Sequence, residues 1–368
     1  MSIWTDLGFT DNPYSPRPIV GNELGESILV GRDQELRQLM QYISSSDTHP
    51  TLEGANGVGK TSLVAVAGYK LFRNWTNGST NQAIIPLNDP FQLTADVSAA
   101  EFKKQVLYRV AQAFIANHEL LRQKGFNVPN VKAIEAWLNC PVLGGLGGGV
   151  SAAGLGGLNA SKTEIANASA GFTEAGFSAT VSEWLRECFP SSTSGGFLCV
   201  IDNLELLDTS RAARALLEAA RDEVLGLQGL QWVLCGARGI IRSAASSPRL
   251  QGILAEPQII HPIADEFVAP LVKSRLDAFA INDNAIVPVD AGGFGHLFNV
   301  GNRNLRNALK YSEDFSIWAV RHDLAHVRDP EKYTLLETWM AEVSDQYLLD
   351  TSGVGNRAWQ VFDQLVAV

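Results

Sequence analysis

One short glycine-rich stretch constrains this chain more than any other feature. Residues 54–61 read GANGVGKT and match the pattern G-x-x-x-x-G-K-[ST] in full. Glycines in this pattern let the backbone turn tightly, so that its N–H groups contact phosphate oxygens, and the following helix directs its positive end at the same anion. PTLEG before the stretch is compatible with a strand, and KTSLVAVAGYKLF after it with a helix. The pattern therefore predicts a phosphate-binding loop between a strand and a helix.

The chemistry of such a loop gives its side chains distinct roles. Lys60 is expected to reach the β- and γ-phosphates, and the Thr61 hydroxyl to ligate Mg²⁺. The other residues expected to contact the nucleotide lie in or beside the loop: Gly54, Asn56, Gly57, Val58, Gly59 and Ser62. The predicted cofactors are thus ATP or ADP with Mg²⁺.

A second signal is an aspartate at the end of an apolar run. FLCVIDNLE, residues 197–205, predicts a buried strand that ends at Asp202. P-loop ATPases hold Mg²⁺ with such an acid, although an aspartate here also suits a helix cap. The next residue is Asn203, where hydrolases often carry a water-activating glutamate, and an amide takes no proton. Glu205 acts in its place only if the turn brings it round, so the sequence predicts slow hydrolysis.

Strands and helices alternate along the first three quarters of the chain, and helices alone follow. This order predicts an α/β fold: a P-loop NTPase with a parallel β-sheet core flanked by helices, plus a C-terminal helical lid. Three parts are expected: an extended arm at 1–28, anchored by its aromatic residues; a core at 29–281; and lid and C-terminal helices at 282–368. A Gly-rich segment at about 140–180 is interpreted as an insert in the core.

Composition limits the partners and the compartment. A formal net charge of −10 disfavours nucleic acid, although a local basic patch would suffice for it. Cys199 and Cys235 lie in apolar runs, which suits a reducing cytoplasm, and the N-terminus lacks the pattern of a signal peptide. Residues 136–161 carry no charge but consist mostly of small residues, so we expect a soluble insert and no membrane span.

With these residues in place, the chain resembles AAA+/STAND P-loop ATPases, above all the initiator (origin-recognition-like) and transposition-regulator groups. The resemblance runs from about residue 12 to 312 and includes NPYSP, LVGRDQEL, QWVLCGARG, SSPRLQGIL and NVGNRNLRNAL. It implies that Val30, Gly31 and Arg32 lie beside the adenine. It also implies a γ-phosphate sensor near Cys235, Gly236 or Arg238.

The same resemblance implies that the site is completed from two further places. SSPRLQGIL resembles the segment with the arginine finger, so Arg249 would act on the nucleotide of a neighbouring subunit in a homo-oligomer. NVGNRNLRNAL resembles the sensor-2 motif of the lid, and its spacing leaves Arg303 and Arg306 as alternatives.

Three functions fit these features. The first is an oligomeric ATPase switch that regulates a separate effector protein, in transposition, replication or antiphage defence. The second is a DNA-binding ATPase that assembles on nucleic acid, which the acidic charge disfavours. The third is a nucleotide-binding scaffold that does not hydrolyse, as Asn203 suggests.

Overall fold

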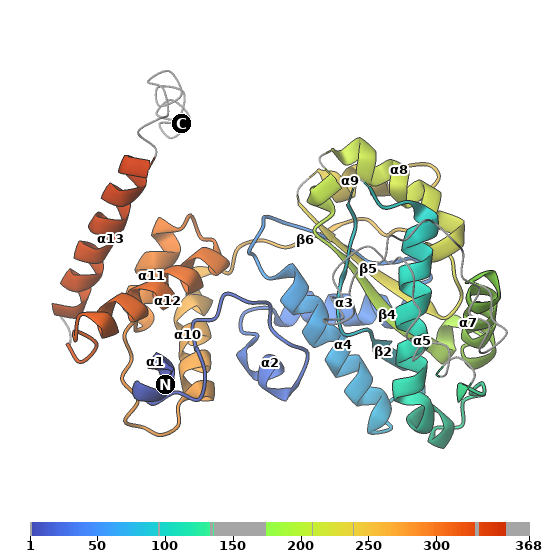
Figure 1. The fold of residues 1–368 in the computed structure, drawn as a ribbon, viewed down its shortest axis with the longest axis horizontal. Helices are drawn as coiled ribbons and strands as arrows, with labels where there is room; N and C mark the ends of the chain where they lie inside the picture. Colours follow the sequence, from blue (N-terminus) through green and yellow to red (C-terminus); the bar gives the residue numbers. More distant parts are fainter. Residues whose placement is uncertain are drawn as a thin grey trace, which may run out of the picture.

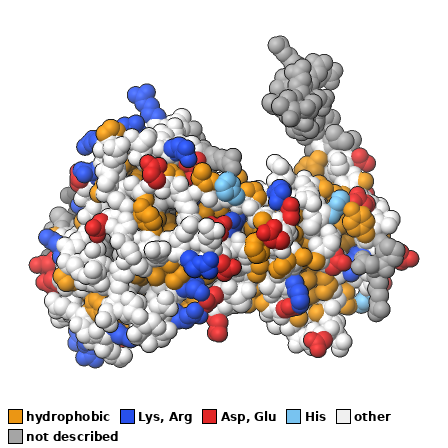
Figure 2. Space-filling view, turned by 180° about the vertical axis from the view of Figure 1, so that it is seen from behind, with side chains coloured by type: hydrophobic (Ala, Val, Ile, Leu, Met, Phe, Trp, Pro, Cys, Tyr) orange, Lys and Arg blue, Asp and Glu red, His pale blue; other side chains and the backbone are white. Residues whose placement is uncertain are grey.

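A sheet unit and a helical unit make up the protein and are joined end to end (Figure 1). The computed structural model describes residues 2–94, 96–132, 135, 174–207, 209–237, 239–327 and 331–350. Figure 2 shows the two units meeting at a narrower junction, where charged side chains of both signs lie beside hydrophobic ones. The sheet unit is called the core below, and the helical unit the lid.

The core sheet is parallel at every described pairing. Its order is β2-β4-β5-β1-β6, and β3 pairs with β4 off this path. Since β5 lies between β1 and β4, the loops that follow β1 and β4 open on one edge of the sheet. Parallel strands between helices, with a phosphate-binding loop after β1, confirm the predicted α/β P-loop fold. The strands are β1 (Thr51–Glu53), β2 (Ala83–Pro86), β3 (Phe91–Gln92), β4 (Gly195–Asp202), β5 (Leu230–Gly236) and β6 (Gln258–Ile259).

Helices cover both faces of the sheet, so its central strands are buried on two sides (Figure 1). Along β4, Leu198 packs in the cluster formed with α3 and α4, whereas Phe197 and Cys199 pack in the cluster with α5, α7 and α8. Strands buried on both faces consist of apolar runs without alternation, which explains the strength of the FLCVI signal. The helices are α3 (Asp33–Ser45) and α4 (Lys60–Thr76) on one face, and α5 (Ala99–Gln123), α7 (Glu174–Cys188), α8 (Ser210–Ala220) and α9 (Ile240–Ala245) on the other; the short turns are η1 (Ser192–Ser194), η2 (Leu204–Leu207) and the π-helical η3 (Arg221–Leu225).

The lid is a group of helices around its own apolar cluster. It contains α10 (Asp265–Phe279), α11 (Ala291–Val300), α12 (Leu305–Arg321) and α13 (Glu331–Asp350). The sequence places the start of the lid at residue 282, but α10 buries Val268, Leu271 and Val272 in the lid cluster and packs against α11. The helical group therefore begins with α10.

The N-terminal segment belongs to both units. It forms the short helices α1 (Ile3–Asp6) and α2 (Glu23–Ile28). Trp4, Phe9 and Tyr14, the expected aromatic anchors, are buried in the lid cluster, while α2 contacts α4 through an ion pair between Glu26 and Lys70 of 2.5 Å. The arm thus supplies part of the lid's core and then crosses to the sheet unit.

Several sequence expectations lie outside the described residues, namely most of the 140–180 segment, the whole uncharged stretch 136–161, and Arg238. Among the helices that are described, none combines the length and the apolar character needed to cross a bilayer. Cys199 and Cys235 are fully buried, as predicted, and burial raises the pKa of both thiols.

Candidate nucleotide-binding site

The predicted phosphate-binding loop joins β1 to α4, and Lys60 and Thr61 are the first residues of that helix. Backbone N–H groups in the first turn of a helix have no partner within it, so they are available to an anion. Gly57 has a φ of 82° and faces the lid, since an added Cβ would lie 2.3 Å from Asn304 Oδ1. Asn304 Nδ2 also donates to Asn56 O at 2.8 Å. The lid therefore rests directly on the loop.

Lys60 is buried and folded back on its own loop. Its Nζ donates to Gly54 O at 3.0 Å and to Ala55 O at 3.1 Å. These two bonds hold the ammonium group beside the loop and use two of its three donors. Phosphate oxygens compete well for such donors, because hydrogen bonds between two charged groups are the stronger ones. The position suits the predicted phosphate contact.

Thr61 and Asp202 form the candidate magnesium site. Thr61 Oγ1 donates to Asp202 Oδ2 at 2.6 Å, and Asp202 Oδ1 accepts the N–H of Asn203 at 3.0 Å. The strand and the helix that carry them converge because β4 ends at the same edge of the sheet as β1. Hydroxyl and carboxylate oxygens are the donors that Mg²⁺ prefers, so the residues present fit this ion.

The two residues expected to handle the attacking water differ in position. Asn203 follows Asp202 with a left-handed φ of 56° and lines the pocket between core and lid. Glu205 is turned away, since its Oε2 accepts the N–H of Ala237 at 3.2 Å in the loop after β5. Among the described residues that line the pocket, Asn203 is present and Glu205 is not. In this arrangement Glu205 supports the neighbouring strand end and does not face the ligand site.

Val30 and Arg32 line the same pocket, and Gly31 packs against Phe267 of α10. Arg32 is 3% exposed, and its guanidinium contacts three groups. It donates to Glu35 Oε1 at 2.7 Å, to Val58 O of the loop at 2.9 Å and to His261 O at 2.7 Å. Arg32 therefore fastens the loop to the segment that leads into the lid.

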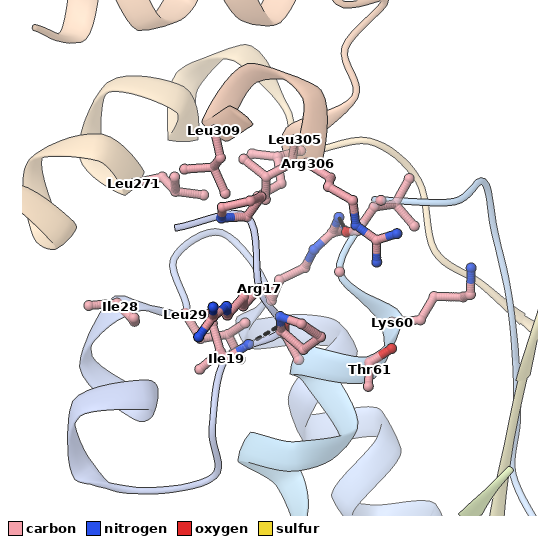
Figure 3. Close-up of a pocket in the computed structure, with 18 of the residues that line it drawn as sticks. Arg17, Ile19, Ile28, Leu29, Lys60, Thr61, Leu271, Leu305, Arg306 and Leu309 are labelled. Carbon is pink, nitrogen blue, oxygen red and sulfur yellow. Dashed lines mark hydrogen bonds between the residues drawn. The ribbon is translucent and has the colours of Figure 1, made fainter. Parts of the chain in front are cut away.

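The structure separates the two sensor-2 candidates. Arg303 has a φ of 58°, and its Nη2 forms an ion pair with Asp265 Oδ1 at 2.7 Å. Arg306, the second residue of α12, lines the pocket, and its Cβ lies 2.9 Å from the Cβ position built on Gly57. Of the two, Arg306 is therefore the one that points at the loop (Figure 3).

Arg249 lies apart from this site. It is exposed and follows α9, where its backbone N–H donates to Ser247 Oγ at 3.3 Å. The hydroxyl of Ser247 in turn donates to Glu218. Arg249 is thus outside the pocket of its own chain.

The pocket has a polar end and an apolar end (Figure 3). Lys60 and Thr61 lie at the polar end. Ile28, Leu29 and Leu271 lie at the other, where Arg17 is the charged neighbour of Leu29. The space between core and lid is about 840 Å³, its open mouth included. The further residues that line it are Pro16, Arg17, Pro18, Ile19, Val30, Arg32, Asn56, Gly57, Val58, Gly59, Ser62, Asp202, Asn203, Ile263, Arg275, Leu305, Arg306 and Leu309.

Sequence reasoning missed several contributors to this pocket, among them Arg17, Ile19 and Arg275. Arg275 had a readable signal, because it follows Val268, Leu271 and Val272 at helical spacing and so falls on the buried face of α10. A charged residue on an apolar stripe has to find partners inside the fold. Nothing local to Arg17 or Ile19 indicates that the arm crosses the pocket.

No family model and no curated protein matches the chain. Among solved structures it is similar to the Aeropyrum pernix ORC1 protein in complex with DNA, with 14% identity, a TM-score of 0.48, and coverage of 94% of this chain and 76% of that one. The Aeropyrum pernix ORC2 protein with ADPNP and ADP has 11% identity, a TM-score of 0.49, and coverage of 91% and 72%. A Walker-type ATPase of Pyrococcus abyssi has 13% identity, a TM-score of 0.41, and coverage of 89% and 87%.

These matches are similarities of backbone path. The fold class itself rests on the sheet order and the phosphate-binding loop.

Proposed function

We propose that this protein binds ATP with Mg²⁺ between its core and its lid and works as a slowly hydrolysing ATPase switch. The observation that carries the proposal is the pocket itself. Its loop end holds Lys60 and the Thr61–Asp202 pair. Its far end is lined by Ile28, Leu29 and Leu271, with the guanidinium groups of Arg17 and Arg275 beside them. A nucleoside triphosphate has the same polarity, with charge at one end and an aromatic base at the other.

The lid gives the switch its moving part. Arg306 and Asn304 of the lid approach the loop, and Arg32 ties the loop to the segment that enters the lid. A γ-phosphate that attracts Arg306 stabilises the closed arrangement, and its loss removes that attraction. Hydrolysis by this site is slow because Asn203 takes no proton and Glu205 is bound to Ala237. Positioning and charge stabilisation then supply the catalysis.

Assembly would complete the site. Arg249 is exposed on its own subunit and is our candidate for a finger that reaches the γ-phosphate of a neighbour. A guanidinium supplied in trans stabilises the charge of the phosphoryl transition state, which makes turnover depend on protein concentration.

DNA is the first partner to test, because an ORC1 protein that this chain resembles was solved with DNA. The net charge of −10 restricts such contact to a local basic surface of the assembled protein. None of the three matched structures above is described with a separate effector protein or with a role in antiphage defence.

One experiment separates these outcomes. ATP binding is measured by titration calorimetry for wild type, for Lys60→Ala, and for Lys310→Ala, whose exposed ammonium pairs with Asp314 on the lid. We expect Lys60→Ala to lose affinity and Lys310→Ala to retain it. Turnover is then measured across protein concentrations, with and without duplex DNA.

Turnover that rises with protein concentration supports the assembled switch, and a further rise with DNA supports assembly on nucleic acid. Turnover that DNA leaves unchanged points to a protein partner, and tight binding without any turnover points to the scaffold. If Lys60→Ala binds ATP as well as wild type does, the proposed function is wrong.

A further inference from the structure

The arm crosses the nucleotide pocket as a strap, defined here as residues 12–19. On the lid side Tyr14 is fully buried, and its hydroxyl donates to Val289 O at 2.5 Å. On the core side the N–H of Ile19 donates to Ser62 Oγ at 3.0 Å, next to Thr61. Pro16, Arg17 and Pro18 line the pocket between these two anchors. The strap therefore spans from lid to phosphate-binding helix across the ligand site.

Arg275 of α10 holds the middle of this strap. Its Nη1 donates to Pro13 O and to Ser15 O, both at 3.2 Å, and its side chain lines the pocket. Arg275 is 4% exposed, and among the described residues these two carbonyls are its hydrogen-bond acceptors. Burying an unpaired guanidinium is unfavourable, and this burial lowers the pKa of Arg275 to about 10. The two hydrogen bonds to strap carbonyls offset part of this desolvation cost.

The position of Arg275 along the pocket indicates which part of a bound nucleotide it affects. Lys60 and Thr61 mark the phosphate end, and Leu271, one turn before Arg275 on α10, marks the opposite end (Figure 3). A triphosphate seated on the loop puts its base at that opposite end. The wall there is built from the strap and from α10, and Arg275 is the residue that joins the two.

We propose that Arg275 is a positioning residue for the base of the bound nucleotide: it fixes the strap in the shape that forms the base end of the pocket. The inference rests on the proposed nucleotide site and adds a residue and a role to it. Both strap carbonyls accept from one nitrogen, Nη1, so the contact requires a long cationic side chain that reaches the strap from α10. Ligands without a base do not use this wall.

The test compares ATP with inorganic tripolyphosphate, which has the phosphates and no base. Both are titrated with Mg²⁺ into wild type, Arg275→Met, Arg275→Lys and Lys273→Met, the last being an exposed residue on the same helix, paired with Asp277. We expect Arg275→Met to weaken ATP by roughly 10- to 100-fold, the range for charge-assisted hydrogen bonds, and to leave tripolyphosphate unchanged. Arg275→Lys should restore part of the loss, and Lys273→Met should behave as wild type.

Equal weakening of ATP and tripolyphosphate by Arg275→Met would show a merely structural residue and overturn the inference, as would unchanged ATP affinity. If Arg275→Met does not fold, the same comparison of ATP with tripolyphosphate is made with Arg275→Lys. The preference for ATP over GTP and CTP is a second readout. We expect the affinities of the three nucleotides to become more alike in Arg275→Met, whereas a merely structural role would leave their ratios as in wild type. Failure of the proposed function looks different, because then Lys60→Ala retains ATP.

Discussion

A methyl group on residue 57 has no room while the lid rests on the phosphate-binding loop. Its Cβ would lie 2.3 Å from Asn304 Oδ1 and 2.9 Å from Arg306 Cβ. Asn304 Oδ1 is also the acceptor that caps α12, through the N–H of Asn307 at 3.2 Å. A side chain that moves aside therefore gives up that cap, together with the bond from Asn304 Nδ2 to Asn56 O.

The magnitude follows from these losses. An alanine at the left-handed φ of Gly57, 82°, costs about 1–2 kcal/mol in backbone strain. Loss of the helix cap adds about 0.5–2 kcal/mol, and loss of one hydrogen bond about 0.5–1.5 kcal/mol. Gly59 supplies the matched control, because its φ is 97° and an added Cβ meets nothing within 4 Å. Gly59→Ala should therefore show the strain alone.

Urea denaturation without nucleotide measures both variants. We expect Gly57→Ala to lower the free energy of unfolding by about 2–5 kcal/mol and Gly59→Ala by about 1–2 kcal/mol. In an Asn304→Ala background, which lacks the cap already, the cost of Gly57→Ala should fall toward that of Gly59→Ala. Equal costs for the two glycine variants in the native background would refute the contact between lid and loop.

Three further predictions follow from the same structure. Asp202→Asn should remove most of the gain in ATP affinity that Mg²⁺ gives, since an amide brings no charge to the ion; calorimetry with Mg²⁺ and with EDTA checks this, and a retained gain contradicts it. Burial lowers the pKa of His49, whose Nδ1 accepts the backbone N–H of Trp232, so the unfolded chain binds a proton more readily than the folded one. The free energy of unfolding should therefore fall as pH drops below 6.5. His49→Gln should flatten this part of a urea-denaturation pH profile, and a profile parallel to that of wild type would contradict the prediction. Phe114 packs in a ring cluster with Trp184, Phe189 and Phe197, so Phe114→Ala should lower the free energy of unfolding in urea by about 3–5 kcal/mol. Tyr42→Ala, at a half-exposed position, is the control, and an equally small loss for both variants would show that the cluster is loosely packed.

The parts of the site that sequence predicts well are those with contiguous signals. The loop occupies residues 54–61, and Asp202 ends an apolar run, so a local pattern suffices for both. The fold class follows from the alternation of strands and helices, because parallel strands need a crossover helix between them. These features needed no knowledge of which distant residues meet.

The features that the sequence did not predict depend on contacts between residues far apart in the chain. Asn304 meets Asn56 across 248 positions, and Arg275 meets Pro13 across 262. Amphipathicity shows that α10 buries one face but not whether that face packs on the sheet or in the lid, so the boundary was placed too late. The choice between Arg303 and Arg306 depends on a left-handed turn that directs Arg303 to Asp265, and spacing alone does not show it.

A crystal structure with Mg²⁺ and a non-hydrolysable ATP analogue tests the central claim most directly. We predict the triphosphate on residues 54–61, with Lys60 Nζ moved from the two carbonyls to phosphate oxygens. The ion should lie beside Thr61 and Asp202, and the base against the strap and α10. An analogue bound elsewhere, or a pocket that stays empty at a saturating concentration of the analogue, would contradict the account.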